Sequence, residues 1–147
     1  MVNQLGNYSL YIALLISIFI IIKTSLSFKN SSVVLSGNIF SLISVQSLMI
    51  IISFLTLIYA FVTSDFSNET VYNNSHTAKP LFYKISGTWG NHEGSLLLWL
   101  LVLTIFLFFF AIDSKNLSQR YRTLTLFFQE IIILGFLLFI LFTSNPF

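Results

Sequence analysis

The chain alternates between long, almost uncharged apolar stretches and shorter polar segments. Four stretches, at about residues 5–22, 39–61, 95–112 and 124–142, approach or reach the ~20 residues that a helix needs to cross the ~30 Å hydrocarbon core of a bilayer. In lipid no water can satisfy backbone polar groups, so each stretch must be helical. The pattern predicts an all-α integral membrane protein with four transmembrane helices, built as a single membrane domain over residues 1–147.

The longest polar segment, residues 62–94, separates the second and third apolar stretches and is the expected outer loop. Its first half, SDFSNETVYNNSH, is polar and turn-like. Its second half places Leu81, Ile85 and Trp89 at a spacing of four, which predicts a short helix lying on the membrane surface. The N-terminus lacks both a basic start before the first apolar stretch and an Ala-x-Ala-like cleavage site, so we expect this stretch to be a retained anchor.

The basic residues in the loops predict the orientation of the chain. The first and third loops together carry five of them: Lys23, Lys29, Lys115, Arg120 and Arg122. The outer loop carries two, Lys79 and Lys84. By the positive-inside rule the first and third loops face the cytoplasm or matrix. Both termini and residues 62–94 are then expected on the periplasmic or intermembrane-space side.

Composition narrows the possible functions. Charged residues make up 8% of the chain and hydrophobic residues 56%, which excludes an ordinary soluble domain. The net charge of +2 argues against nucleic-acid binding, which needs a dense basic face. With no cysteine, the chain has no disulfides, thiolate metal ligands or cysteine nucleophiles. Abundant Phe, Ile, Asn and Lys with little Ala and Gly are typical of an AT-rich genome, such as that of an organelle.

A cluster of polar residues stands directly before the third apolar stretch, in the segment GTWGNHEGSLLLWLL. His92 and Glu93 begin like a zinc-metalloprotease motif, but Leu96 occupies the place of the second histidine, so no metal site is predicted. One interpretation is a helix start, with Asn91 as N-cap and Glu93 near the positive end of the helix dipole. The cap leaves His92 unexplained.

The other interpretation is a ligand site at the outer membrane boundary. The His92 imidazole could ligate or orient a haem, or bond a quinone. Trp89 and Trp99 would provide an aromatic surface for a flat, partly polar ligand, although Trp is also enriched at membrane interfaces as an ordinary anchor.

Glu130 is the acid predicted to lie within the bilayer, with Gln129 beside it. A buried acid costs free energy, which makes it a functional candidate, for example in proton transfer. Arg122 lies about two turns away, so snorkelling toward it is a second interpretation. An interhelical hydrogen bond is a third.

The segment around the polar cluster also carries a family resemblance. TWGNHEGSLLLWLL resembles the WGxHEGSLLLW signature of the CcmF family, the membrane subunit of the cytochrome c maturation haem lyase. SFLTLIYAFVTSDFS, NNSHTAKPLFYKISGTWG and GFLLFILFTSNPF resemble the family's second span, its approach to the signature and its fourth span. Asn91 departs from the alanine common in the signature, and Glu130 from a small or apolar residue.

The resemblance covers essentially the whole chain but only the N-terminal part of the family. The family's Trp-rich haem-handling segment, with a WGGxWxWD-like core, and its haem-ligating histidines come later and are absent here. The resemblance therefore implies an N-terminal piece of the family, either the product of a split mitochondrial gene or a truncated sequence. The implied location is the mitochondrial inner membrane, with a bacterial plasma membrane as the alternative. The implied partners are the remaining CcmF segments on another chain, other maturation subunits, a haem chaperone and apocytochrome c.

The family's enzyme receives haem at the outer face, keeps its iron reduced and directs the vinyl groups to the two thiols of a Cys-x-x-Cys-His sequence. The resemblance implies that Trp89, His92, Glu93 and Trp99 line or support the outer haem site; it assigns no catalytic residue. The four spans contain no histidine, so axial ligands for a haem inside the membrane are not expected in this chain.

Two other functions compete with this one. A small respiratory-complex or proton-translocating subunit would use Glu130 as its working acid. Such subunits usually carry acids near mid-membrane on more than one helix, and this sequence has one. The second is a purely structural assembly subunit without ligand contact.

Overall fold

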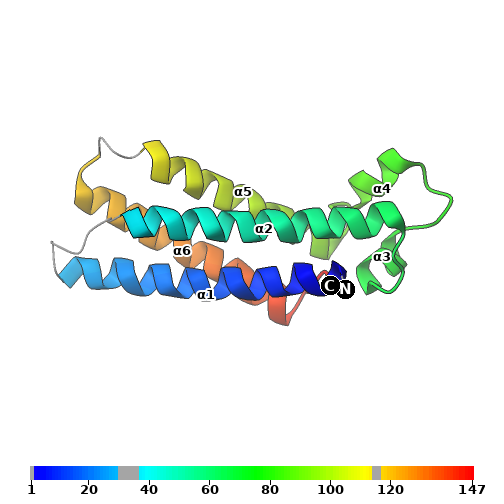
Figure 1. The fold of residues 1–147 in the computed structure, drawn as a ribbon, viewed down its shortest axis with the longest axis horizontal. Coiled ribbons are helices and arrows are strands. Elements are labelled where there is room, and N and C mark those ends of the chain that lie inside the picture. Colours follow the sequence, from blue (N-terminus) through cyan, green and yellow to red (C-terminus); the bar gives the residue numbers. More distant parts are fainter. Residues whose placement is uncertain (1, 30–36, 114–116) are drawn as a thin grey trace.

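The computed structural model describes residues 2–29, 37–113 and 117–147, so Lys115 lies outside the described residues. The described helices, in chain order, are α1 (Val2–Lys29), α2 (Gly37–Thr63), α3 (Glu69–Asn74), α4 (Leu81–Gly87), α5 (His92–Asp113) and α6 (Gln119–Phe142). The four long helices lie side by side along the molecule, and the short α3 and α4 lie at one end of them (Figure 1). All four long helices are long and apolar enough to cross a membrane, which confirms the predicted all-α multi-pass architecture.

Each long helix extends beyond the apolar stretch that predicted it. α1 has 28 residues, and α5 begins at His92, three residues before the predicted span. At ~1.5 Å per residue, 28 residues reach about 42 Å, which exceeds the ~30 Å hydrocarbon core. The helices continue into the headgroup region because a capped or solvated end can satisfy its backbone groups there.

The four helices close into a ring in which each packs against two neighbours: α1 against α2 and α6, and α5 against α2 and α6. Apolar seams at helical spacing produce this packing. The buried positions of α5 include Leu97, Leu100, Leu107 and Ala111, separated by whole or double helical turns. Spacings that mix three and four residues keep one face of the helix toward its partners.

Several buried hydroxyl groups within the long helices bond to the backbone of their own helix. The donors, each bonded to the carbonyl four residues earlier, include Ser9, Thr24, Ser47, Thr104 and Thr123, at distances of 2.7 to 2.9 Å. This bond leaves the hydroxyl satisfied without water, so serine and threonine are tolerated at core positions in lipid.

Both chain termini and the outer loop meet at the same end of the bundle (Figure 1). The Asn3 side chain donates to Asp65 at 3.1 Å, and the Asn68 side chain donates to the Pro146 carbonyl at 2.9 Å. The Ser67 hydroxyl and backbone N–H also donate to Asp65, and these bonds hold the pKa of its carboxyl below the usual value. The predicted gathering of the termini and residues 62–94 at one end is thus observed.

The prediction of a turn-like first half of the outer loop was wrong for residues 69–74, which form α3. Asn68 caps this helix, because its side-chain oxygen accepts a hydrogen bond from the Val71 N–H at 3.1 Å. Val71 is fully buried and anchors α3 to the hydrophobic core. The mostly polar sequence carries no periodic signal for this helix. One N-cap and one buried valine are nevertheless enough to hold a single short helix against the hydrophobic core.

The predicted helix in the second half of the loop is present as α4 and ends at Gly87, two residues before Trp89. Its contacts are with the end of α2: Lys84 Nζ donates to the Ser64 hydroxyl at 2.6 Å, and Gly87 faces the Phe61 ring. Three successive residues, Leu81, Phe82 and Tyr83, are exposed. The helix therefore shows large apolar side chains on more than one face, rather than the single stripe that the spacing indicated.

The junction of α4 and α5 is fixed by a cap and a close backbone approach. Asn91 accepts a hydrogen bond from the Gly94 N–H at 2.7 Å and donates to the carbonyls of Gly87 and Thr88. This confirms Asn91 as the N-cap of α5. A Cβ at Gly94 would overlap the Thr88 carbonyl oxygen, so the preceding turn can pack here only against a glycine.

We predict that Gly94→Ala destabilises the chain, because the overlap is with backbone that cannot rotate away. The expected loss is on the order of 1–3 kcal/mol in the free energy of unfolding, as for other overpacked sites. Gly135→Ala is the matched control, since a Cβ at Gly135 meets nothing within 4 Å. Thermal unfolding in detergent measures both variants. Equal melting temperatures for the two variants would contradict the close approach at Thr88.

Candidate functional site

His92 and Trp99 lie on one exposed face of α5. They are seven residues apart, which is nearly two whole turns of helix, so their side chains leave the axis in almost the same direction. His92 is exposed, and its ring contacts that of Phe139 on α6 edge-on, with centroids 6.5 Å apart. Trp99 is 61% exposed. This face is open to lipid or to another polypeptide, and it begins at the end of the bundle that carries α3, α4 and both termini.

Trp89 lies in the turn between α4 and α5, three residues before His92, and is 41% exposed. The neighbouring Thr88 is fully buried, so the turn is anchored by its threonine and leaves the indole outside. Trp89, His92 and Trp99 are therefore all accessible near the start of α5. The cap at Asn91 and the close backbone approach at Gly94 fix the turn before α5, and with it the positions of these three side chains.

Glu93 points into a different environment. It lines a polar recess of about 240 Å³ between α3, the start of α5 and the C-terminal segment. The other residues of this polar recess are Glu69, Thr70, Asn73, Asn74, Thr143, Ser144, Asn145 and Phe147. Glu93 therefore faces the polar recess, whereas the accessible face of α5 carries His92.

The accessible residues fit one side of a haem. An exposed imidazole can supply one axial ligand, and two indoles offer flat apolar surface. A second histidine, His76, is exposed in the loop before α4, where its Nδ1 accepts a hydrogen bond from the Ala78 N–H at 3.2 Å. Within residues 2–29, 37–113 and 117–147 no group of three or more metal-ligating side chains is found. These residues can therefore contribute to a haem surface that other polypeptide segments complete.

Glu130 is fully buried at the centre of the bundle. Its Oε2 accepts a hydrogen bond from the Ser17 hydroxyl of α1 at 2.8 Å and another from the Gln46 amide of α2 at 3.1 Å. Three helices are thus joined through one carboxyl group, in a polar network formed by Ser17, Gln46 and Glu130. Within the described residues, Glu130 Oε1 and Gln46 Oε1 have no hydrogen-bond partner.

The contacts of Arg122 and Gln129 decide between two interpretations of Glu130, namely snorkelling toward Arg122 and an interhelical hydrogen bond. The Arg122 guanidinium donates to the Ala111 carbonyl at 3.0 Å, so it serves the end of α5 rather than Glu130. Gln129 donates to the Leu103 carbonyl at 3.3 Å, across the α5–α6 contact. The interhelical hydrogen bond was the correct interpretation. Sequence reasoning missed Gln46, although an amide in the middle of a span is itself a signal of a polar contact.

No family model matches the chain, but individual relatives and a solved structure do. The cytochrome c-type biogenesis protein CycK of Rhizobium meliloti is 42% identical over 147 residues, which is 100% of this chain and 22% of that protein. The cytochrome c-type biogenesis protein CcmF of Haemophilus influenzae is 38% identical over 100% of this chain and 23% of its own length. The chain spans less than a quarter of the length of these relatives.

A solved structure of the cytochrome c haem lyase CcmF aligns with all of this chain and 25% of its own, with a TM-score of 0.89 and 26% sequence identity. The match therefore includes the arrangement of all four long helices as well as the sequence. Both comparisons agree with the signature at the start of α5, where the polar residues of the candidate site stand. This chain belongs to the CcmF family of cytochrome c-type biogenesis proteins.

Proposed function

We propose that the chain is a subunit of a haem lyase, the holocytochrome c synthase that attaches haem to apocytochrome c. In this proposal it contributes the first part of the membrane scaffold and one wall of the outer haem site. The supporting observation is the start of α5, where one capped junction presents Trp89, His92 and Trp99 at the accessible outer end of the bundle. Haem is the substrate of this reaction, and it is attached through its vinyl groups to two thiols.

The roles of the four site residues follow from their surroundings. His92 would ligate or orient the haem, and Trp89 and Trp99 would contact its apolar ring. Glu93 would brace the site by holding α5 against α3 and the C-terminal segment, since it faces the polar recess. A haem held wholly inside the membrane would take its axial ligands from other segments, because the four apolar spans of this chain contain no histidine.

The chain covers 22% and 23% of its relatives, so the proposed function also requires the remaining family segments. The proposed partners are a chain that carries these segments, other cytochrome c maturation subunits, a haem chaperone and apocytochrome c. The proposed location is the mitochondrial inner membrane, supported by the AT-rich character of the composition, with the termini and residues 62–94 in the intermembrane space. A bacterial plasma membrane is the alternative location.

Purification of the tagged chain from native membranes tests this proposal. We expect haem in the absorption spectrum and, by mass spectrometry, a second polypeptide carrying the Trp-rich segment of the family. A respiratory complex in place of maturation subunits, together with normal cytochrome c in cells lacking this chain, would overturn the proposal.

We predict that His92→Ala lowers the yield of holocytochrome c by on the order of tenfold, as for other residues that ligate or orient a metal group. The same variant should shift the haem absorption band of the purified complex. His76→Ala is the matched control, because His76 is also an exposed histidine of the outer region. The role of His92 is refuted if both variants retain wild-type yield and spectrum while the complex assembles.

Glu130 distinguishes this function from proton translocation. If the carboxyl group acts as a scaffold, Glu130→Gln keeps an acceptor for Ser17 and Gln46 and should be mild. Glu130→Asp is shorter and should lose part of the network, and Glu130→Leu should cost on the order of 1–3 kcal/mol in the free energy of unfolding.

Holocytochrome c yield and melting temperature in detergent measure the series. A proton path reverses the order of the two polar variants: Glu130→Asp would retain activity and Glu130→Gln would abolish it. That reversed order, at unchanged melting temperature, would favour the proton-translocating alternative.

A further inference from the structure

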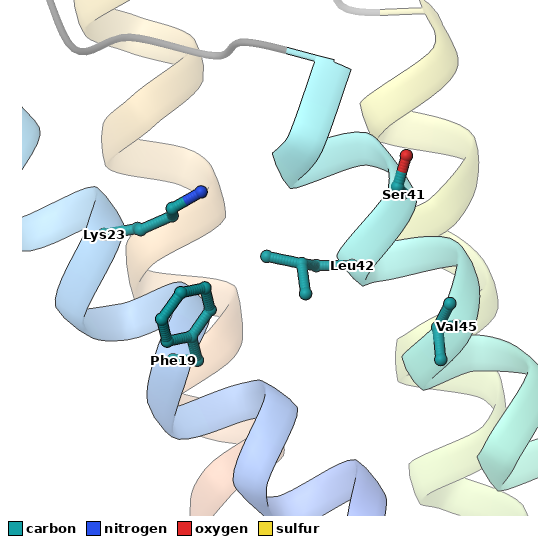
Figure 2. A pocket seen from close by; sticks show the side chains of 5 residues that line it. All are labelled: Phe19, Lys23, Ser41, Leu42 and Val45. Carbon is teal, nitrogen blue, oxygen red and sulfur yellow. The ribbon is translucent and has the colours of Figure 1, made fainter.

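A cleft opens between α1 and α2 near the end of the bundle opposite the candidate site. It has a volume of about 360 Å³ and is lined by Phe19 and Lys23 of α1 and by Ser41, Leu42 and Val45 of α2. Figure 2 shows Leu42 reaching toward Lys23 and Phe19 across the gap, with Val45 further along α2. We call this the α1–α2 cleft. Its lining is mostly apolar, with one hydroxyl from Ser41 and a single cation at one edge.

The cation is held in place at the mouth of the cleft. Lys23 Nζ stands 5.3 Å from the centroid of the Phe19 ring, one turn earlier on the same helix. A cation over an aromatic face is attracted by the ring, which restricts an otherwise flexible side chain. No acidic side chain is among the residues lining the cleft. Among the residues that line the cleft, no carboxylate neutralises the charge of Lys23, so an anionic ligand could pair with it there.

The depth of the cleft matches the boundary between hydrocarbon and lipid headgroups. Lys23 directly follows the uncharged run 5–22, whose 18 residues span about 27 Å. Its ammonium group can therefore reach the headgroup layer, while Phe19 and Val45 stay at the level of the acyl chains. Arg120 and Arg122, at the start of α6, lie toward the same end of the bundle. Basic pockets between transmembrane helices on the cytoplasmic or matrix side recognise anionic lipid headgroups.

The size of the cleft favours a lipid chain over a protein helix. A single helical turn, ~10 Å across and 5.4 Å high, occupies more than about 400 Å³. The cleft is smaller than that, yet falls within the ~300–1,000 Å³ typical of small-molecule pockets. An open, mostly apolar groove with a cation at one edge is complementary to an acyl chain that ends in a phosphate.

We propose that the α1–α2 cleft binds one anionic phospholipid. Its phosphate pairs with Lys23, and one acyl chain lies against Phe19, Leu42 and Val45. The bound lipid would fill the gap between the two helices at the cleft and would hold their spacing there. This proposal concerns the face of the bundle away from the haem site and is independent of the proposed haem lyase function.

Lipid retention in native mass spectrometry tests the proposal. The full chain, purified from native membranes, is reconstituted in nanodiscs of equal parts phosphatidylcholine and phosphatidylglycerol, and the lipids that stay bound on release are identified. We expect one phosphatidylglycerol to be retained in preference to phosphatidylcholine. Lys23→Gln should lower that preference on the order of fivefold, since one basic residue near the headgroups contributes a change of roughly that size.

Two further variants separate a site from diffuse attraction. Lys23→Arg keeps the charge and should keep the preference. Arg120→Gln removes an exposed cation outside the cleft and should leave it nearly unchanged. Equal losses for Lys23→Gln and Arg120→Gln would show general surface attraction and overturn the proposal, as would equal retention of the two lipids by the wild-type chain.

The apolar half of the cleft has its own test. Val45→Trp fills the groove at a position that is 43% exposed, so the fold should tolerate it. It should reduce phosphatidylglycerol retention with the melting temperature unchanged. A photoreactive residue at Val45 in native membranes should capture lipid; capture of another polypeptide would overturn the proposal, because that chain would then occupy the cleft.

Discussion

The structure depends on one constraint: a backbone in hydrocarbon must find all its hydrogen-bond partners within the protein. This constraint converts four apolar stretches into helices, and it also explains what the helices tolerate. Buried hydroxyls such as Thr104 bond to the carbonyl one turn earlier, so polar residues can lie in the core without water. All irregular backbone of the described residues is placed at the two ends of the bundle (Figure 1).

The need to find hydrogen-bond partners within the protein also explains the surroundings of the buried Glu130. On α6 it falls in the buried seam between Leu126 and Ile133, at spacings of four and three, where an apolar residue would ordinarily stand. Its carboxyl group accepts hydrogen bonds from two other helices. Apolar packing between lipid-embedded helices is weakly directional, whereas a hydrogen bond fixes the rotation of each helix. The polar network of Ser17, Gln46 and Glu130 therefore specifies how α1, α2 and α6 face one another.

The sequence predicts the bundle well because span length and hydrophobicity are local properties. Asn91 as the cap of α5 was predictable for the same reason: a cap involves only the next turn of chain. The burial of Glu130 also follows from its spacing, but its partners do not, because Ser17 and Gln46 are 113 and 84 residues away in the chain. α3 was missed, since its stability comes from a buried Val71 and a distant carbonyl at Pro146 rather than from a periodic pattern.

Local helix geometry also explains why His92 and Glu93 of the candidate site face different surroundings. His92 and Glu93 are neighbours in sequence, yet successive residues of a helix point about 100° apart. Glu93 consequently turns toward α3 and the C-terminal segment, and His92 toward the open face that it shares with Trp99. A short bundle with such an open face has nothing of its own to enclose a flat ligand there. In the proposed function, further polypeptide would enclose the ligand, in keeping with a chain that spans less than a quarter of its relatives.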